Sequence, residues 1–278
     1  MSDIAVDFRT IVDIPKPGFQ IEPCEEMLFV GSCFADSIGQ RFIENKYRAT
    51  VNPYGVMYNP ASILHTVEKY EGLPRIVFIT LGTNHVYRLR ETGEIVDNCQ
   101  KRPAALFQEE QLTVDECTDY LRRTVDLLRS RRPDVQIVFT VSPIRYRKYG
   151  YHQSLLSKAT LLLAVDRVIS TFNAQHSTFN AIYFPAYEIV MDELRDYRFY
   201  REDMLHPSAQ AVEYIWQQLV EHYFSPRAKD FLREWAPLKA ALSHRPFHPD
   251  SEEYRQFIDD THAKVDALLS RYSTASMQ

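Results

Sequence analysis

Hydrophobic residues in this chain gather in short unbroken runs, separated by longer stretches of helical spacing. Four such runs are rich in β-branched and aromatic residues, which favours buried strands, and they lie at residues 27–30, 75–81, 135–141 and 179–184. Elsewhere apolar residues recur every three or four positions, which predicts helices over residues 35–43, 61–70, 113–131, 155–172 and 209–223. Strands that alternate with helices form parallel sheets through right-handed crossovers. The pattern therefore predicts an α/β fold, a three-layer α/β/α sandwich with a mostly parallel sheet.

Three segments depart from this alternation. Residues 1–26 contain three prolines and are expected to form an extended N-terminal arm along the domain. Residues 86–96 are polar enough for a hairpin, which would turn at residues 91–93. Four more prolines follow residue 225, before a polar helix near residues 254–272. We expect one domain over residues 1–225 and a helical C-terminal extension, residues 226–278, packed on this domain or on a second copy in a homo-oligomer.

Composition narrows the class of protein. The hydrophobic fraction of 45% and the charged fraction of 25% are ordinary for a globular protein. The net charge of −5 and the lack of a long basic tract argue against a nucleic-acid partner, because neutralising phosphates takes clustered Lys and Arg. No apolar run approaches the length of a membrane span, and the N-terminus lacks the pattern of a signal peptide. We therefore expect a cytoplasmic protein with no membrane partner.

The cysteines and histidines do not predict a metal site. The four cysteines show no CxxC spacing, and the nine histidines show no HExxH pairing. We expect neither a metal nor another cofactor.

Candidate chemistry begins where the first strand ends. The apolar run closes on Gly31, and Ser32 and Cys33 follow directly before a predicted helix. Strand, glycine turn, serine and helix is an order that holds a nucleophile at the carboxyl end of a sheet, with a helix N-terminus facing developing negative charge. Serine also caps helices very often, so this segment alone leaves open whether Ser32 does more than cap.

A second segment, Asp203-Met204-Leu205-His206, would supply the base that a serine needs. A carboxylate three residues before a histidine can accept the Nδ1–H of its ring, which leaves Nε2 to take the serine proton. The plainer alternative is a surface Asp and His before a helix capped by Ser208. Together with Ser32, the pair predicts a Ser-His-Asp hydrolytic site.

Residues 31–35 read GSCFA in one-letter code, which is the motif that gives a known protein family its name. This chain resembles the GSCFA family, a branch of the SGNH (GDSL-like) hydrolase superfamily, over about residues 25–215. The similarity extends to Asn52–Val56, Thr80–Thr83, Asn98–Pro103, Val141–Arg145, Ser157–Leu161 and Asp203–Ser208. The resemblance implies an SGNH-hydrolase-like, flavodoxin-like fold. It also implies Ser32 as nucleophile, His206 as base and Asp203 as the acid that orients it.

The resemblance further suggests which groups bind the oxyanion. The backbone N–H groups of Ser32 and Gly55 and the side-chain amide of Asn84 are the candidates, with Asn98 in reserve for the amide. Gly55 could equally be a turn residue after the Asn-Pro step. Where the superfamily carries an Asp after the asparagine, this chain has His85, which puts Asn84 in question.

Two further hypotheses concern neighbouring residues. Cys33 is a rival nucleophile, although a cysteine in such a position is usually a small apolar filler. Arg145 is expected to line a polar substrate pocket. The same role is open to Tyr58, Tyr87, Tyr146 and Lys158, for which loop-exposed charge and partly buried rings are the preferred interpretation.

The function that these residues predict is a serine esterase of acetylesterase type. It would cleave a small acyl ester from a carbohydrate or a related small hydroxylated molecule. Two alternatives stay open. One is a non-catalytic carbohydrate-binding or scaffold protein that keeps the fold, and the other is an O-acyltransferase that uses the same triad.

Overall fold

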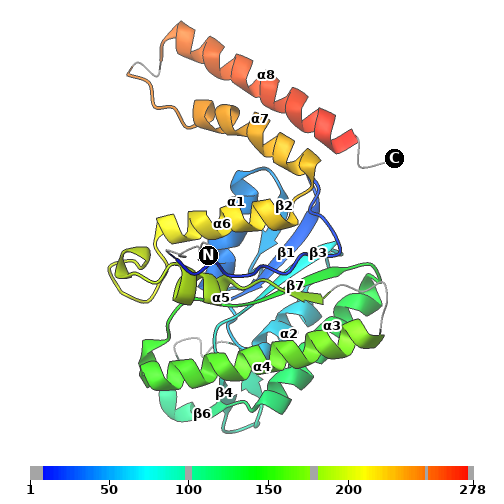
Figure 1. The fold of residues 1–278 in the computed structure, drawn as a ribbon, viewed down its shortest axis with the longest axis vertical. Coiled ribbons are helices and arrows are strands. Elements are labelled where there is room, and N and C mark those ends of the chain that lie inside the picture. Colours follow the sequence, from blue (N-terminus) through cyan, green and yellow to red (C-terminus); the bar gives the residue numbers. More distant parts are fainter. Residues whose placement is uncertain (1–8, 98–101, 176–180, 248–249, 275–278) are drawn as a thin grey trace, which may run out of the picture.

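A computed structural model describes residues 9–97, 102–175, 181–247 and 250–274 (Figure 1). Its centre is a five-stranded sheet in the order β2-β1-β3-β7-β8, in which every pair is parallel. The strands are β1 (Glu26–Gly31), β2 (Arg48–Val51), β3 (Ile76–Leu81), β7 (Gln136–Val141) and β8 (Ala181–Tyr183). The predicted α/β class and the parallel sheet are confirmed, and β2 is a strand that the sequence pattern did not indicate.

Side chains that alternate along β1 divide the interior into two cores. Phe29 packs with Phe78 on one face of the sheet, at a ring-centroid distance of 4.7 Å, while Leu28 and Val30 belong to the core on the other face. A strand that is buried on both faces reads as a continuous apolar run. This is why the pattern located β1, β3 and β7 so closely.

Helices cover both faces, so the molecule has three layers (Figure 1). The helices on the two sides of the sheet are α1 (Cys33–Glu44) and α6 (Ala209–Tyr223) on one, and α2 (Pro60–Lys69), α3 (Val114–Arg131) and α4 (Tyr151–Gln175) on the other. Helix α4 begins four residues earlier than predicted. Its first turns are polar and lie at the end of the sheet where the strands terminate.

A small antiparallel sheet, in the order β5-β4-β6, follows β3. Its strands are β4 (His85–Leu89), β5 (Ile95–Val96) and β6 (Phe107–Gln111). The predicted hairpin corresponds to β4 and β5, which pair through Tyr87 with Val96 and Arg88 with Ile95. Strand β6 was not predicted, because its exposed Gln and Glu residues hide the alternation of an edge strand.

Beyond α6 the chain forms a helical hairpin of α7 (Pro226–Leu242) and α8 (Glu252–Thr274), which projects from the sandwich in Figure 1. Helix α7 contacts the end of α1, since the Trp235 Nε1–H donates to the carbonyl of Glu44 at 3.0 Å. Tyr47 also meets Phe231 edge to face. This contact fixes the base of the hairpin against the sandwich.

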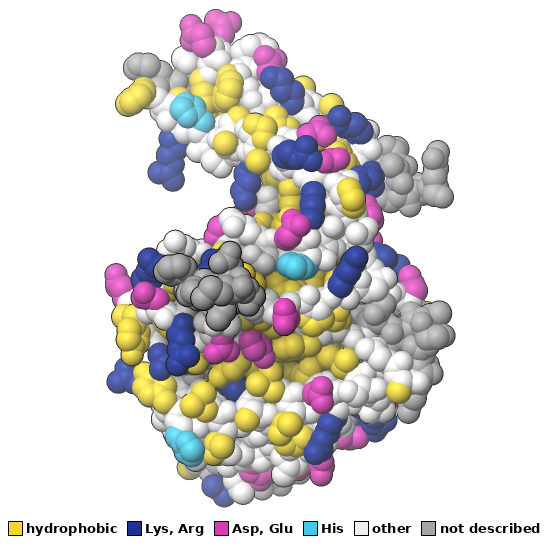
Figure 2. Space-filling model, in the orientation of Figure 1, with side chains coloured by type: hydrophobic (Ala, Val, Ile, Leu, Met, Phe, Trp, Pro, Cys, Tyr) yellow, Lys and Arg dark blue, Asp and Glu magenta, His cyan; other side chains and the backbone are white. Residues whose placement is uncertain are grey.

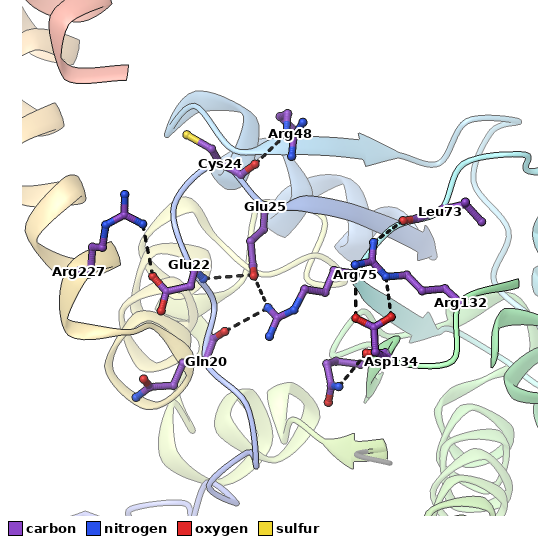
Figure 3. Close-up of polar contacts among 11 residues, drawn as sticks. Gln20, Glu22, Cys24, Glu25, Arg48, Leu73, Arg75, Arg132, Asp134 and Arg227 are labelled. Carbon is purple, nitrogen blue, oxygen red and sulfur yellow. Dashed lines mark hydrogen bonds and ion pairs between the residues drawn. The ribbon is translucent and has the colours of Figure 1, made fainter. Parts of the chain in front are cut away.

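Charged residues join the N-terminal arm to the sheet at the amino ends of the strands (Figure 3). The Arg75 guanidinium pairs with Glu25 and also donates to the carbonyl of Gln20 at 3.4 Å. Burial raises the pKa of Glu25, against the lowering effect of Arg75. Arg227 of α7 lies 3.9 Å from Glu22. These contacts hold the arm at the edge opposite the candidate site, so we assign them a structural role.

Figure 2 shows a hydrophobic area where α4 and β8 are exposed on the same face of the molecule. A hollow of about 570 Å³ lies here, lined by residues that include Leu163 and Ile169 of α4 and Ile182 of β8. None of the predicted site residues lines it. It is therefore a feature of the open sheet edge and not part of the site described below.

Candidate active site

The candidate site lies at the carboxyl ends of the parallel strands. Ser32 follows β1, Gly82 follows β3, and Ser142 follows β7. Gly31 makes the first turn possible, because its φ is +143° and a Cβ built on it would lie 2.0 Å from the Thr80 carbonyl oxygen. Only glycine allows this close approach to the neighbouring strand. The turn places Ser32 directly at the N-terminus of α1.

Ser32 is 5% exposed, and it caps α1. Its Oγ accepts the Phe34 N–H at 3.3 Å. Its own N–H donates to the Thr80 carbonyl at 3.0 Å. The backbone N–H that was expected in the oxyanion hole is thus engaged with the adjacent strand. The hydroxyl proton and a second lone pair of Oγ are left for chemistry.

Asp203 and His206 form a pair held by three hydrogen bonds. Asp203 Oδ2 lies 2.6 Å from His206 Nδ1, and Oδ1 accepts the backbone N–H groups of Leu205 at 2.8 Å and His206 at 3.0 Å. The two backbone N–H groups, then the imidazole, lower the pKa of Asp203 to about 2. The Asp203 carboxylate is ionised at neutral pH and faces Nδ1 of His206, so Nε2 lies on the other side of the ring. This is the geometry that orients a histidine base.

The loop that carries this pair is a short turn between antiparallel partners Tyr200 and Pro207. The Arg201 N–H donates to the His206 carbonyl at 2.8 Å, and Met204 at the tip has a φ of 58°. A non-glycine residue in this region stores strain that the surrounding bonds must hold. The loop therefore presents His206 in one defined position.

The loop meets the same edge of the sheet as Ser32. The Arg145 N–H, four residues past the end of β7, donates to the Leu205 carbonyl at 3.1 Å. The positive charge of Arg201, on this loop, also has a lowering effect on the pKa of Cys33, the neighbour of Ser32. No hydrogen bond between the Ser32 hydroxyl and His206 is present among the described residues. Catalytic hydrogen bonds often shorten only when a substrate binds.

Cys33 is poorly suited to be the nucleophile. Partial burial and the Asp36 carboxylate raise the pKa of its thiol, and Arg201 opposes them only in part. A reactive cysteine needs a lowered pKa, because the thiolate is the attacking species. The environment of Cys33 therefore favours Ser32 in this role.

The expected oxyanion donors are arranged differently from the sequence prediction. Gly55 has a φ of +95°, and its N–H donates to the Asn52 carbonyl at 2.9 Å, so the alternative role as a turn residue describes it. Asn84 is buried, and its Nδ2 donates to the Leu112 carbonyl at 2.7 Å, with one N–H left. Asn98 lies outside the described residues.

Asn52 is a site residue that sequence reasoning passed over. Its Oδ1 accepts the Gly31 N–H at 2.9 Å, and its Nδ2 donates to Asp36 at 2.6 Å. One side chain thus fixes the end of β1 to the first turn of α1. The signal was the Asn-Pro step, since asparagine tolerates the φ of 40° found here and also bonds to nearby backbone.

Arg145 lies beside the loop of Asp203 and His206, as a pocket residue should. Its guanidinium stacks on Tyr151 and Tyr200, at 4.4 and 5.4 Å from the ring centres, and donates to the Met204 carbonyl at 3.4 Å. Two adjoining hollows share Arg145, Tyr187 and Met191, with volumes of about 90 and 550 Å³. Arg145 thus lines both hollows, and its role in a substrate pocket stays a prediction.

Three half-buried tyrosine rings extend from the Ser32 side of the site. The rings of Tyr58 and Tyr146 lie 6.4 Å apart, and those of Tyr146 and Tyr149 lie 5.2 Å apart. Tyr58 is close to Ser32, because a Cβ built on Gly82 would lie 2.7 Å from Tyr58 Cβ and 3.3 Å from Ser32 Cβ. We call these three rings the tyrosine row.

Charged and hydroxyl groups border the far end of the tyrosine row. Lys148 Nζ lies 3.1 Å from both carboxylate oxygens of Glu109 and contacts the hydroxyls of Tyr87 and Tyr149. His85 stacks on Tyr149 at a ring-centroid distance of 3.8 Å. Burial lowers the pKa of His85. A neutral imidazole therefore supports the last ring of the row.

Lys158 contradicts the preferred expectation of a loop-exposed charge. It lies on α4 and is 3% exposed, and its Nζ donates to the carbonyls of Gly82 and Ser142 at 2.6 and 2.7 Å. The helical pattern that predicted α4 contained this residue, but a lysine on a helix is normally solvated. Sequence alone gave no reason to bury it.

A second His–Asp pair anchors the end of the small sheet to α2. His65 Nδ1 lies 2.6 Å from Asp97 Oδ1, and Lys69 Nζ lies 2.9 Å from Oδ2. The hydrogen bond to Asp97 raises the pKa of His65, while the bonds from His65 and Lys69 lower the pKa of Asp97 against the effect of burial. Both shifts mean that the folded state favours the charged pair.

We expect Asp97→Asn to destabilise the protein in a pH-dependent way. The raised pKa of His65 gives stability that is complete below about pH 6.5 and is lost as the pH rises through the folded pKa. The lowered pKa of Asp97 gives stability above about pH 4 that is lost on acidification. The free energy of unfolding of Asp97→Asn should therefore fall below that of the wild type most strongly near pH 5.5, by up to about 1 kcal/mol, as measured by thermal unfolding. An equal difference at pH 5.5 and pH 9 would contradict this account.

Two other kinds of feature are absent from the part of the chain that the structure describes. Within the described ranges, no group of three His, Cys, Asp or Glu side chains is arranged to hold a metal ion. Nor does the described chain contain a helix whose length and hydropathy would suit a membrane span.

Comparison with known proteins identifies the family of this chain and structures with a similar fold. The model of the GSCFA family matches residues 26–74 and 72–219, and that of the GSCFA domain protein, C-terminal domain, matches residues 235–278. The comparison with curated proteins gives no match. A structure described as a GDSL-like lipase from Parabacteroides merdae is similar with a TM-score of 0.50 at 13% identity, over 75% of this chain and 99% of that chain.

Two carbohydrate esterases of family 3 are also similar. That of Talaromyces cellulolyticus has a TM-score of 0.41 at 10% identity, over 75% of this chain and 98% of its own. That of Clostridium thermocellum has a TM-score of 0.42 at 14% identity, over 76% of this chain and 98% of its own. At such low identity the P. merdae structure shows the fold alone, and it is the fold that the sequence predicted.

Proposed function

The chain belongs to the GSCFA family, and we propose that it is a serine esterase that removes a small acyl group, acetyl in the simplest case, from a hydroxyl of a carbohydrate or related molecule. The observation that carries the proposal is the bonded pair of Asp203 and His206, held at the edge of the sheet where Ser32 begins α1. The structure of the GDSL-like lipase from P. merdae shares the fold, which is compatible with this chemistry.

In the proposed reaction, Ser32 Oγ attacks the acyl carbon while His206 Nε2 takes the hydroxyl proton. Asp203 holds the ring through Nδ1 and stabilises the imidazolium that forms. The proton then passes to the departing alcohol oxygen, leaving an acyl-serine. Water then attacks the acyl carbon with His206 again as base, and His206 returns that proton to Ser32 Oγ as the carboxylic acid leaves. The N-terminal turn of α1 supplies positive potential for the oxyanion, because the aligned peptide dipoles of a helix leave partial positive charge at this end.

The substrate class follows from the tyrosine row. Aromatic faces with nearby hydroxyl, ammonium and carboxylate groups suit a sugar, which has apolar C–H faces and a rim of hydroxyls. Tyr58 begins the row next to Ser32 and Tyr149 ends it. Tyr87, Lys148 and Glu109 border that far end. An ester on a sugar bound along the row would extend toward Ser32.

The direct test combines turnover with covalent labelling. The protein is incubated with p-nitrophenyl acetate and with an acetylated xylo-oligosaccharide, and acetate release is measured. A fluorophosphonate probe is then applied, and the labelled peptide is identified by mass spectrometry. We expect acetate release from both substrates and a label on Ser32. A protein that neither releases acetate nor reacts with the probe would not be an esterase.

We expect Tyr146→Ala to weaken carbohydrate binding selectively. Loss of the central ring should raise the KM for the acetylated oligosaccharide about tenfold, equivalent to about 1.4 kcal/mol, because a stacking surface is removed. The kcat for p-nitrophenyl acetate should change less than about twofold, since that ester does not need the row. Tyr254→Ala on α8 serves as the matched control and should leave both values unchanged. A uniform loss with both substrates would argue against the row as a sugar site.

One observation favours a second candidate, a non-catalytic carbohydrate-binding protein. Both the Oγ and the N–H of Ser32 already have structural partners. Binding of oligosaccharide without labelling of Ser32 would support this reading. An O-acyltransferase would instead be recognised in the turnover assay by acetyl transfer to an added sugar in place of release to water.

A further inference from the structure

A buried lysine lies beneath the candidate site without an acidic partner. Among the described residues, Lys158 Nζ bonds only to the Gly82 and Ser142 carbonyls, and no carboxylate lies within ion-pair distance of it. Burial lowers the pKa of Lys158 to about 7, so the ammonium form predominates below that pH. Placing an ammonium in the interior without a counter-ion opposes folding, so a role for Lys158 in function would explain its retention there.

The two carbonyls belong to the first residues after β3 and β7. Two serines on the same face of α4 also bond to the backbone of these loops. Ser157 Oγ accepts the Asn84 N–H at 2.9 Å, and Ser154 Oγ accepts the Tyr146 N–H at 3.1 Å. We call Ser154, Ser157 and Lys158 the α4 clamp. It attaches the loops that follow two neighbouring strands to one rigid helix.

One of the two loops contacts Ser32, and the other contacts the residue before His206. Gly82 packs against Ser32, since a Cβ built on it would lie 3.3 Å from Ser32 Cβ. The loop after Ser142 reaches Leu205, the neighbour of His206, through the Arg145 N–H. Lys158 bonds to the first residue of both loops at once, so it connects the serine side of the site to the histidine side.

We propose that Lys158 is a positioning residue for acyl transfer, whose ammonium holds the loops that support Ser32 and His206 in register. This inference rests on the proposed function. The positive charge matters for two reasons. An ammonium donates to two carbonyls more strongly than a neutral donor does. A buried cation near Ser32 also favours the negative charge that forms there during attack.

The test uses removal and chemical replacement of the side chain. We expect Lys158→Ala to lower kcat for p-nitrophenyl acetate about 100-fold while KM changes less than about threefold, because alignment and not binding is lost. Lys158 also lines the hollow of about 90 Å³ described above, which gives a small amine a route to the vacated space. Adding n-propylammonium should restore kcat of Lys158→Ala at least about tenfold, a gain that 1-propanol of similar size should not give.

Control variants distinguish a loss of kcat through misalignment of the site from a loss of folded protein. Lys229→Ala, on α7 and far from the site, should behave like the wild type with and without amine. Lys158→Met keeps the volume of the side chain without the charge, so it should fold and still show the low kcat. Circular dichroism of every variant gives the folded fraction, by which each rate is corrected.

Each outcome decides the inference. Recovery by the amine and not by the alcohol supports it. Wild-type kcat in Lys158→Met overturns it, as does a loss of rate that matches the loss of folded protein with no recovery by amine. If neither variant folds even with amine, Lys158 is structural and the inference is also overturned. A wild type that shows no turnover and no label on Ser32 refutes the proposed function itself, which is a different result.

Discussion

Ser32→Ala should lower kcat/KM for an acetyl ester by at least about 10⁴-fold, because the variant lacks the atom that forms the acyl bond. The same change removes the cap of α1 and should reduce the free energy of unfolding by about 1 kcal/mol. These two effects are separable, because the first is read from steady-state kinetics at saturating and low substrate and the second from urea unfolding.

Two variants complete the experiment on Ser32. Ser225→Ala removes an equivalent cap from α7, where Ser225 Oγ accepts the Ala228 N–H at 3.0 Å, and should cost similar stability with full activity. Cys33→Ala should retain activity within about twofold, as the raised pKa of its thiol indicates. If Cys33→Ala were inactive and Ser32→Ala active, the thiol would be the nucleophile and the proposed assignment wrong.

Asp203→Asn should lower kcat by about 10³- to 10⁴-fold with little change in KM. The amide oxygen can still accept the backbone N–H groups of Leu205 and His206, so the loop should keep its shape. What is lost is the negative charge that fixes the tautomer of His206 and stabilises its protonated form.

The matched control for this change is Asp196→Asn. Asp196 also accepts a backbone N–H, that of Arg198 at 3.0 Å, but it does not contact His206. Its replacement should leave kcat within about twofold of the wild type. An Asp203→Asn protein with wild-type kcat would show that the carboxylate only shapes the loop, and hydrogen-exchange of the loop amides would then locate its role.

The parts of the site that could be predicted are those that depend on near neighbours in sequence. Gly31 ends a buried strand and Ser32 caps the helix that follows, so their turn is determined locally. Asp203 and His206 are three residues apart, a spacing at which a carboxylate reaches the ring. For the same reason the class of fold was predictable, since runs buried on both faces and helical spacing are local patterns.

The parts that could not be predicted depend on what the tertiary structure buries. Lys158 looks like any solvated lysine on a helix, and only the positions of Gly82 and Ser142 reveal its bonds. The expected oxyanion donors differ for a related reason. The N–H of Ser32 donates to the Thr80 carbonyl on the neighbouring strand. This bond depends on the register between the two strands, which cannot be read from a single sequence.

The order of the strands has a consequence for synthesis of the protein. The chain makes β1 and Ser32 first, builds the sheet outward to β8, and only then returns over α1 with α6, where Trp216 meets Phe42 at 4.9 Å. A nascent polypeptide halted before residue 206 would hold an alcohol but no imidazole to activate it. Under the proposed mechanism, a polypeptide that ends before residue 206 lacks the base and would be inert.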